Sequence, residues 1–235
     1  MVQKSRFHLS SQEQKIILFM ISKIKPNALN FGDQMFNILE FCKVCGIDYE
    51  NGKNYKNIKN TIKTLADKSM WIDDNGVNKL FRWISEVDIY AQSGMIRVKL
   101  QDNMKPHLLQ LHEHFTQYEL IYALAMKSQY SIRMYELFKS YEYRQRCKFD
   151  IDELKHILFA EKYSRFPDFK RKVLDISMRE INELTDITVT YQVIKNGRKY
   201  IGIDFSIRIK KDIDERMSAW SKIDEAMSAS KHLVG

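Results

Sequence analysis

The chain has 235 residues, 44% hydrophobic and 29% charged, a composition typical of a globular protein with one or two domains. Its 38 Lys and Arg against 30 Asp and Glu give a net charge of +8, which favours a polyanionic partner such as nucleic acid or an acidic membrane surface. No apolar run approaches the roughly 20 residues that span a bilayer, and the N-terminus lacks the apolar core of a signal peptide. We therefore expect a cytoplasmic protein.

The first half of the chain predicts three helices followed by a hairpin. The helices are expected over 13–24, 35–47 and 55–70, where apolar residues recur at helical spacing. The hairpin is expected in two extended segments, 79–90 and 95–100, on either side of the turn AQSG. The third helix has a lysine-rich side opposite its apolar stripe, formed by Lys56, Lys59 and Lys63. Both a solvated surface and a contact with DNA phosphates remain open for this side.

After a predicted helical linker over 107–126, the second half repeats this order of elements. Helices are expected over 131–143, 150–160 and 163–182. The hairpin that follows has alternating apolar residues on both strands, namely Val189, Tyr191 and Val193 on the first and Ile201, Ile203, Phe205 and Ile207 on the second. Asn196-Gly197 is predicted as its two-residue turn.

The two halves also resemble each other in sequence. FNILEF, from Phe36 to Phe41, is similar to FDIDEL, from Phe149 to Leu154. The apolar stripes of the two third helices match at a constant offset, Tyr55, Ile58, Ile62 and Leu65 with Phe166, Phe169, Val173 and Ile176. Two copies of helix, helix, helix and hairpin predict an α+β fold of two tandem winged-helix (helix-turn-helix) domains joined by a helical linker. The predicted domains are residues 1–117 and 118–211, followed by a tail, 212–235, in which Ile213, Met217, Trp220 and Met227 allow an amphipathic helix.

The predicted helix over 163–182 combines an apolar face with a basic one. The apolar face consists of Phe166, Phe169, Val173, Ile176, Ile181 and Leu184, and Pro167 is tolerable in the first turn. The other sides carry Arg165, Lys170, Arg171, Lys172 and Arg179. A helix that reads DNA needs this division, because one side packs on its domain while another projects donors into the major groove.

The predicted hairpin tip adds Lys195, Asn196, Arg198 and Lys199, which could reach phosphates beside that groove. Surface helices also carry Lys and Arg simply for solubility. From Leu120 to Lys211, however, 19 Lys and Arg stand against 12 Asp and Glu, a net charge of +7. Most of the excess charge therefore lies in the half with the clearest helix and hairpin, which favours DNA binding.

The chain also resembles a known family. Its segments LSSQEQKIILFMISKI, IKTLADKSMWI, FTQYELIYALAMKSQYSIRMYELFKSY and FKRKVLDISMREINELTDITVTYQVIKNGRKYIGIDFSI are similar to those of iteron-binding plasmid replication initiator proteins, the RepA/RepE-like family. The resemblance implies two winged-helix domains that bind directly repeated double-stranded DNA at a plasmid origin as a monomer. It also implies help in melting adjacent AT-rich DNA and recruitment of the host initiator and replicative helicase. A homodimer joined through the first domain would repress the protein's own gene or restrain replication.

The resemblance further implies roles for single residues. Arg165, Lys170 and Arg171 would face bases, and Arg133, Lys195, Arg198 and Lys199 would contact phosphates. Ser164, Lys172 and Asn196 complete the predicted DNA-binding set of the second domain, and Lys56, Lys59 and Lys63 form that of the first. No cofactor or metal is predicted, because Cys42 and Cys45 lack a second metal-binding pair and fit buried helical positions.

Two other functions remain open. A winged-helix transcriptional repressor without initiator activity would use the same DNA-binding residues. A metal-dependent rolling-circle nickase would use His112 and His114 as ligands and Tyr135 as nucleophile, but on a helix residues two apart point about 200° apart. The sequence has no G-x-x-x-x-G-K-[ST] loop to bind nucleotide phosphates. We therefore predict a protein that is not an enzyme and opens DNA only through binding energy, deformation and partners.

Overall fold

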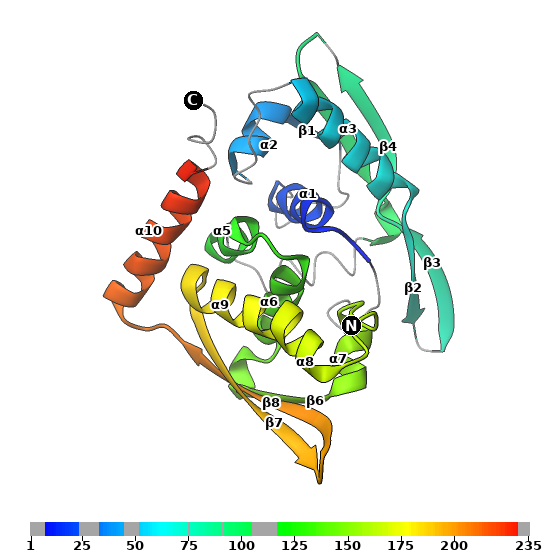
Figure 1. Ribbon diagram of the computed structural model, residues 1–235. Helices are drawn as coiled ribbons and strands as arrows, with labels where there is room; N and C mark the ends of the chain where they lie inside the picture. The colour runs from blue at the N-terminus through cyan, green and yellow to red at the C-terminus, as the bar shows by residue number, and fades with distance from the viewer. Residues whose placement is uncertain are drawn as a thin grey trace. The chain divides into compact units, whose positions relative to one another are not determined.

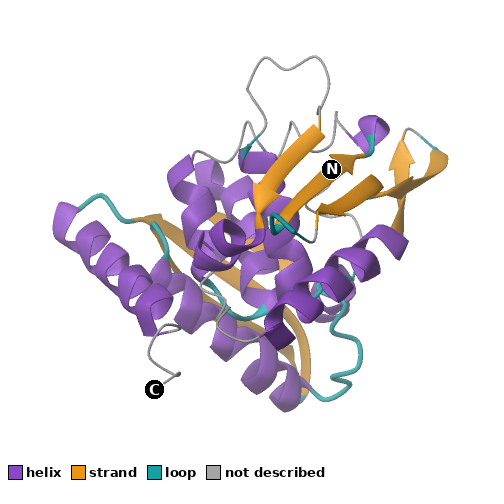
Figure 2. Ribbon diagram, turned by 90° about the horizontal axis from the view of Figure 1, so that it is seen from above, coloured by secondary structure: helices purple, strands orange, loops and turns teal. Residues whose placement is uncertain are grey.

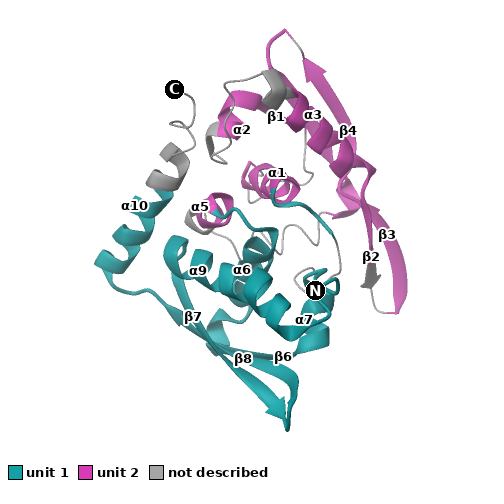
Figure 3. Cartoon of the chain, viewed as in Figure 1, with its two compact units in different colours: residues 1, 3–11, 126–223 teal, residues 2, 12–125, 224–235 magenta. Residues whose placement is uncertain are grey.

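The computed structural model describes residues 8–23, 33–44, 52–74, 76–90, 92–104 and 117–229. They form two compact units, each of which mixes helices and strands (Figures 2 and 3). The N-terminal unit comprises residues 12–125 and the described residues 224–229, and the C-terminal unit comprises residues 126–223 together with the described residues 8–11. The predicted domain boundary at 117/118 falls at the start of α5 (Gln117–Ala125), whereas the two units divide at the end of this helix.

The N-terminal unit contains a three-stranded antiparallel sheet in the order β1-β5-β4 and a separate hairpin, β2–β3. Rings of Phe19, Phe36 and Phe41 pack together at its centre, with centroids 5.4 to 5.9 Å apart. Its elements are α1 (Ser11–Ser22), β1 (Asp33–Asn37), α2 (Ile38–Val44), α3 (Gly52–Asp67), β2 (Ser69–Asp74), β3 (Val77–Arg82), β4 (Ile84–Tyr90), β5 (Met95–Leu100), η2 (Asp102–Met104) and α5.

Two predictions for the N-terminal unit were wrong in detail. The helix predicted over 35–47 begins only at Ile38, because residues 33–37 pair with β5 and the Asn37 side chain accepts a hydrogen bond from the Leu39 amide, as at a helix start. The strand predicted over 79–90 is split at Trp83 into β3 and β4, and β3 pairs with a strand, β2, that the sequence reading missed. The strand over 95–100 is confirmed, with Ile96, Val98 and Leu100 fully buried.

The C-terminal unit places its helices on one side of a second three-stranded antiparallel sheet, β6-β8-β7 (Figure 1). Phe138 of its first helix meets Phe205 of the central strand, with ring centroids 5.0 Å apart. Its elements are α6 (Gln129–Ser140), η3 (Glu142–Arg144), β6 (Arg146–Asp150), α7 (Ile151–Ile157), α8 (Phe166–Phe169), the π-helical segment η4 (Lys170–Leu174), α9 (Asp175–Leu184), β7 (Ile187–Asn196), β8 (Lys199–Ile209) and α10 (Ile213–Ala229).

The long hairpin β7–β8 is confirmed, but its turn is shifted by one residue. Asn196 pairs with Lys199, so the two turn residues are Gly197 and Arg198 rather than Asn196 and Gly197. Gly197 has a φ of 58°, the positive value that the first position of a type II′ turn requires.

The similarity between the two halves corresponds to a shared structural unit. In each half a short strand runs directly into a helix, β1 into α2 and β6 into α7, and each strand pairs with the second strand of the hairpin. Phe36 and Phe149 occupy the fourth position of these strands, and both are buried. The sequence indicated this repeat but neither short strand: residues 35–37 of β1 were predicted as helix, and residues 146–149 of β6 lay between two predicted helices.

The tail contains a helix, α10, but its apolar residues are not arranged as predicted. Ile213 and Met217 are 71% and 64% exposed, whereas Ala219 and Ile223 are buried. Arg208 of β8 forms two hydrogen bonds with Glu215 at the start of α10, and this contact lowers the pKa of Glu215. No helix in the described ranges has the length and apolar character needed to cross a membrane.

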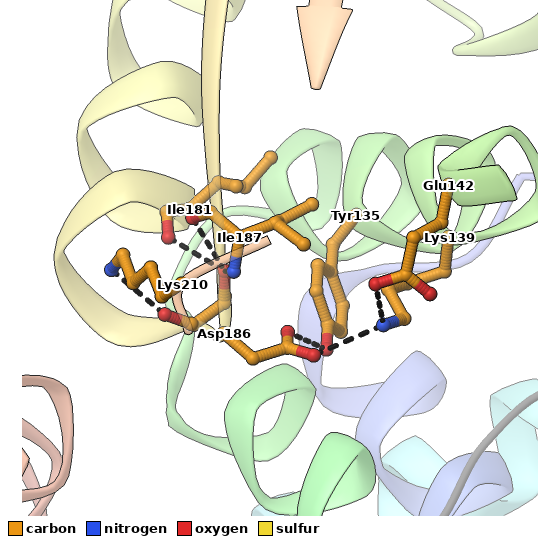
Figure 4. A network of polar contacts seen from close by, with 8 residues as sticks. Tyr135, Lys139, Glu142, Ile181, Asp186, Ile187 and Lys210 are labelled. Carbon is orange, nitrogen blue, oxygen red and sulfur yellow. Dashed lines mark hydrogen bonds and ion pairs between the residues drawn. The ribbon is translucent and has the colours of Figure 1, made fainter. Parts of the chain in front are cut away.

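A buried polar network joins the sheet to the helices at the corner between α9 and β7 (Figure 4). The Asp186 carboxylate accepts a hydrogen bond from the Tyr135 hydroxyl at 2.7 Å and from Lys139 Nζ at 3.0 Å. The Asp186 carbonyl accepts one from the Lys210 amide, and Lys210 Nζ donates to the carbonyls of Asn182 and Thr185. Burial lowers the pKa of Lys210.

We predict that Asp186→Ala lowers the free energy of unfolding by about 3 kcal/mol, because removal of one member of a buried ion pair leaves the other poorly compensated. Lys139 is only 3% exposed and would keep Glu142 as its remaining carboxylate partner. Urea unfolding followed by circular dichroism measures the change. Asp152→Ala, at an exposed aspartate of α7, is the control and should change stability by less than about 1 kcal/mol. Equal midpoints for the two variants would contradict the prediction.

Candidate nucleic-acid interface

The predicted DNA-reading helix is one continuous helical run made of α8, η4 and α9. Pro167 lies in its first turn, where a missing amide costs nothing. Phe169, Val173, Leu174 and Ile181 are completely buried. Because η4 is π-helical, the neighbours Val173 and Leu174 both face the core, and the apolar stripe is not the regular one predicted from the sequence.

Three cations near the start of this run are exposed, and we call them the helix cations: Arg165, Arg171 and Lys172. Arg171 makes a 3.3 Å ion pair with Asp168, but its side chain is 71% exposed, so the pair contributes only about 0 to 1 kcal/mol. Lys172 has no ion pair or hydrogen bond with any other described residue. These side chains can therefore bind a polyanion without losing a strong contact within the protein.

Lys170 differs from the helix cations because it is partly buried and engaged. Its Nζ lies 2.7 Å from one Asp175 oxygen and 2.9 Å from the other. The hydrogen bond to Asp175 raises the pKa of Lys170. The Tyr191 hydroxyl of β7 donates to the same Asp175 carboxylate, and burial raises the pKa of this phenol. Lys170, predicted to face bases, therefore lies in a contact between the helix and the hairpin.

The hairpin tip presents a second exposed group, which we call the tip cations: Lys195, Arg198 and Lys199. Asn196 and Gly197 of the turn are exposed as well. The Lys195 ammonium lies 4.8 Å from the ring centroid of Tyr200, its partner on the opposite strand. All the residues predicted at the tip are thus accessible.

Three side-chain contacts connect the helical run to the hairpin along its length. Near the base, the Asn182 side chain donates to the Val189 carbonyl at 3.0 Å and accepts from the Val189 amide at 2.7 Å. In the middle, Asp175 meets Tyr191. Towards the tip, the rings of Phe166 and Tyr200 stack with centroids 4.3 Å apart. The helix cations and the tip cations are therefore carried by elements that are joined at several points.

Sequence reasoning missed this set of connecting residues. Asn182 and Asp175 look like ordinary surface positions in the sequence, because only the pairing of helix and strand brings them to Val189 and Tyr191. The one available signal was the position of Tyr191 among the alternating apolar residues of the hairpin, which placed its ring on the helix side.

Two other residues predicted to bind DNA, Ser164 and Arg133, differ in their exposure. Ser164 is exposed in the turn before α8, and its carbonyl accepts a hydrogen bond from Lys155 Nζ. Arg133, in contrast, is 4% exposed and donates to Glu136 at 2.8 Å. Burial raises the pKa of Glu136. Because the Arg133 guanidinium is engaged inside the protein, the structure does not support its predicted contact with a phosphate.

In the N-terminal unit, Lys56, Lys59 and Lys63 lie exposed on α3, opposite the buried Ile58 and Ile62. Lys63 pairs with Asp67 one turn later, and the Asp67 hydrogen bond raises the pKa of Lys63. The predicted division of this helix into an apolar and a lysine-rich side is therefore present. Its contact with DNA stays a prediction.

The residues proposed for nickase chemistry are not assembled into a site among the described residues. The Tyr135 ring is fully buried and its hydroxyl donates to Asp186, so it is not exposed to a phosphodiester. His112 and His114 lie outside the described residues, as does Cys45. Cys42 and Cys147 are buried, and no cluster of three His, Cys, Asp or Glu residues in the described ranges could hold a metal.

Two family models match the chain and together cover most of it. The model described as Initiator Replication protein, WH1, matches residues 1–139, and the model described as Initiator Rep protein, WH2, matches residues 150–207.

Among curated proteins, the chain is similar to the PI protein of Escherichia coli, with 29% identity over 166 residues. The alignment covers 63% of this chain and 52% of the relative, so the chain spans about half the length of the curated protein that it matches.

Two solved structures of domains 2 and 3 of RctB share the fold. The selenomethionine derivative has a TM-score of 0.51 at 11% identity and covers 86% of this chain and 82% of its own. The second structure has a TM-score of 0.52 at 12% identity and covers 91% and 87%. The WH1 domain of MSBI1.176, a replication protein isolated from a multiple sclerosis patient, has a TM-score of 0.35 at 20% identity and covers 47% of this chain and 88% of its own.

Proposed function

Because this chain belongs to the family of plasmid replication initiator (Rep) proteins, which bind DNA through two winged-helix domains, we propose that it binds directly repeated double-stranded DNA at a plasmid origin. Binding would help to open adjacent DNA and recruit the host initiator and replicative helicase. One observation supports this proposal above all. The helical run and the hairpin tip each carry a group of exposed cations, and side-chain contacts join the two elements.

The helix cations are the proposed base readers. A major groove admits a helix, and an arginine that donates two hydrogen bonds to guanine discriminates by about 1 to 3 kcal/mol. That gain exceeds the value of the exposed pair between Arg171 and Asp168, so Arg171 can leave Asp168 for a base. Lys170 is less suited to this role, since contact with a base would require it to give up both Asp175 oxygens.

The tip cations are the proposed phosphate contacts. A hairpin tip can lie along the backbone beside the groove that the helix enters. Each phosphate neutralised by a cation releases condensed counterions, which makes the affinity fall as salt is raised. Lys56, Lys59 and Lys63 of α3 would add phosphate contacts of the same kind from the N-terminal unit.

A homodimer in equilibrium with the monomer is the proposed repressing form. The β2–β3 hairpin of the N-terminal unit carries two apolar residues directly opposite each other, Trp71 and Leu80, which are 62% and 51% exposed. Exposed apolar side chains that lie together, unlike single scattered ones, mark surfaces that another protein can cover. A second copy of the chain, paired through the same surface, would bury both.

The initiator function is tested by replication of a plasmid that carries the cognate origin and depends on this chain supplied from a second plasmid. We expect the wild-type chain to support replication and a triple variant of the helix cations, Arg165→Ala, Arg171→Ala and Lys172→Ala, to fail while remaining folded. A wild-type chain that silences its own promoter but never supports replication would instead be a repressor.

For individual contacts, we predict that Arg171→Ala weakens binding to the repeat by about 1 to 3 kcal/mol and reduces discrimination at particular base pairs. Lys199→Ala should weaken binding to all duplexes alike and reduce the slope of log affinity against log salt by about one. Fluorescence anisotropy on repeat and scrambled duplexes at several salt concentrations measures both effects.

Lys222→Ala removes the same charge from an exposed position of α10 and serves as the matched control. It should leave discrimination unchanged. The assignment of base and phosphate contacts would be wrong if Arg171→Ala and Lys199→Ala lowered the affinities for repeat and scrambled DNA in the same proportion.

For the homodimer, we predict that Trp71→Ser shifts the chain towards monomer, because it removes the largest exposed apolar side chain of the β2–β3 hairpin. Sedimentation across a range of protein concentrations measures the dissociation constant, which should rise at least about tenfold. Tyr143→Ser, at an exposed aromatic residue of the C-terminal unit, is the control. An unchanged constant would exclude this hairpin as the dimer surface.

A further inference from the structure

The Phe166 ring and the Tyr200 ring connect the start of the helical run to the hairpin tip. Phe166 is the first residue of α8, directly after Arg165, and Tyr200 is the second residue of β8, directly after Lys199. Their rings are nearly parallel, with an interplanar angle of 21° and centroids 4.3 Å apart. Each ring therefore sits next to one of the exposed cations in the chain.

A β-bulge is the reason that Tyr200 meets the helix. Side chains alternate between the faces of a strand, and Ile203, Phe205 and Ile207 of β8 are buried on the helix side. Regular alternation would place Ile201 there too, as the sequence predicted. The register of the hairpin shifts between Ile194 and Lys195, so that Ile201 is an extra residue and is 38% exposed. The bulge turns the Tyr200 ring to the helix side in its place.

The hairpin tip also lacks the support of a third strand. β6 pairs with β8 only from Ser206 back to Gly202, so the tip beyond Gly202 is a two-stranded ribbon. The Phe149 carbonyl approaches so closely that a Cβ on Gly202 would lie 3.1 Å from it, which marks where the three-stranded sheet ends. Ribbons of two strands are only marginally ordered by themselves. The tip therefore depends on contacts outside the sheet for a fixed position.

We infer that the stack of Phe166 on Tyr200 is a positioning contact that fixes the tip cations relative to the helix cations, so that both groups engage one DNA duplex together. Tyr200 also lies under the Lys195 ammonium, which extends the same contact to the tip. The inference rests on the proposed function, since it assigns the contact a role in binding double-stranded DNA. Tyr200 acts through Lys195, Arg198 and Lys199 and need not touch DNA itself.

If the stack has this role, the contribution of the tip cations to DNA binding depends on how firmly the tip is held against the helical run. With the stack intact, the tip is held where its cations meet phosphates once the helix is in the groove. Without the stack, the tip must be ordered on binding, and its cations contribute less. We expect Tyr200→Ala to weaken binding to a repeat duplex about two- to tenfold and to lower the salt slope by about one.

The test uses the full chain and the anisotropy assay on repeat and scrambled duplexes. Lys199→Ala is measured in the wild-type background and in Tyr200→Ala. A positioning role predicts that Lys199→Ala has a clearly smaller effect on affinity and salt slope once Tyr200 is replaced. Tyr200→Phe should behave like the wild type, because it keeps the ring. Phe166→Ala should reproduce Tyr200→Ala, and the double variant should be no worse than either.

Two controls separate this role from general destabilisation. Tyr143→Ala makes the same change at an exposed tyrosine of η3 and should leave the salt slope unchanged. Thermal unfolding of each variant shows that the binding assay is run on folded protein.

Additive effects of Lys199→Ala and Tyr200→Ala would overturn the inference, and so would a Tyr200→Phe variant as weak as Tyr200→Ala, since the hydroxyl would then be the active group. If the wild-type chain binds repeat and scrambled duplexes equally, the proposed sequence-specific binding is wrong. The coupling is still judged in that case, because the tip cations would act on the phosphates of any duplex.

Discussion

The arrangement of the C-terminal unit depends on the buried Asp186 carboxylate. A buried carboxylate is costly unless it is paired and hydrogen-bonded, and this one is satisfied only where Tyr135 and Lys139 of α6 reach it together. Its carbonyl meanwhile accepts from the Lys210 amide after β8. Asp186, in the short connection between α9 and β7, thus holds the end of α9 and the bases of both hairpin strands against α6. These contacts set the position of the hairpin.

The residues that make the family recognisable in the sequence belong largely to this scaffold. In YSIRMYELFKSY, Tyr135 and Lys139 hold Asp186, which itself lies in TDI. In EIN, Glu180 accepts a hydrogen bond from the Ser128 amide at the start of α6, and Asn182 holds Val189. Such residues preserve how a helix and a hairpin are joined. The exposed cations are carried by that scaffold but take no part in holding it together through Asp186 or Asn182.

The sequence allowed the tandem fold to be predicted because hydrophobic periodicity and an internal repeat are local signals. It also predicted which segment carries the basic helix and which the basic hairpin tip. It could not predict β1, β2 and β6, since a short strand is defined by its partner rather than by its own residues. For the same reason the burial of Arg133, the engagement of Lys170 and the bulge at Ile201 were missed, because each depends on contacts between distant segments or strand register.

The two units share a plan but differ in how helix and hairpin are connected. In the C-terminal unit only Thr185 and Asp186 separate α9 from β7, so the helix and the hairpin are bound closely by their own chain. In the N-terminal unit the β2–β3 hairpin is inserted between α3 and β4. Because of this insertion, the third helix and the β4–β5 hairpin are not joined by a short connection. The inserted hairpin also adds the exposed apolar pair Trp71 and Leu80. The shared plan therefore fits the proposed base reading in one unit and the proposed protein contact in the other, because specific reading requires fixed geometry, whereas an apolar surface requires only exposure.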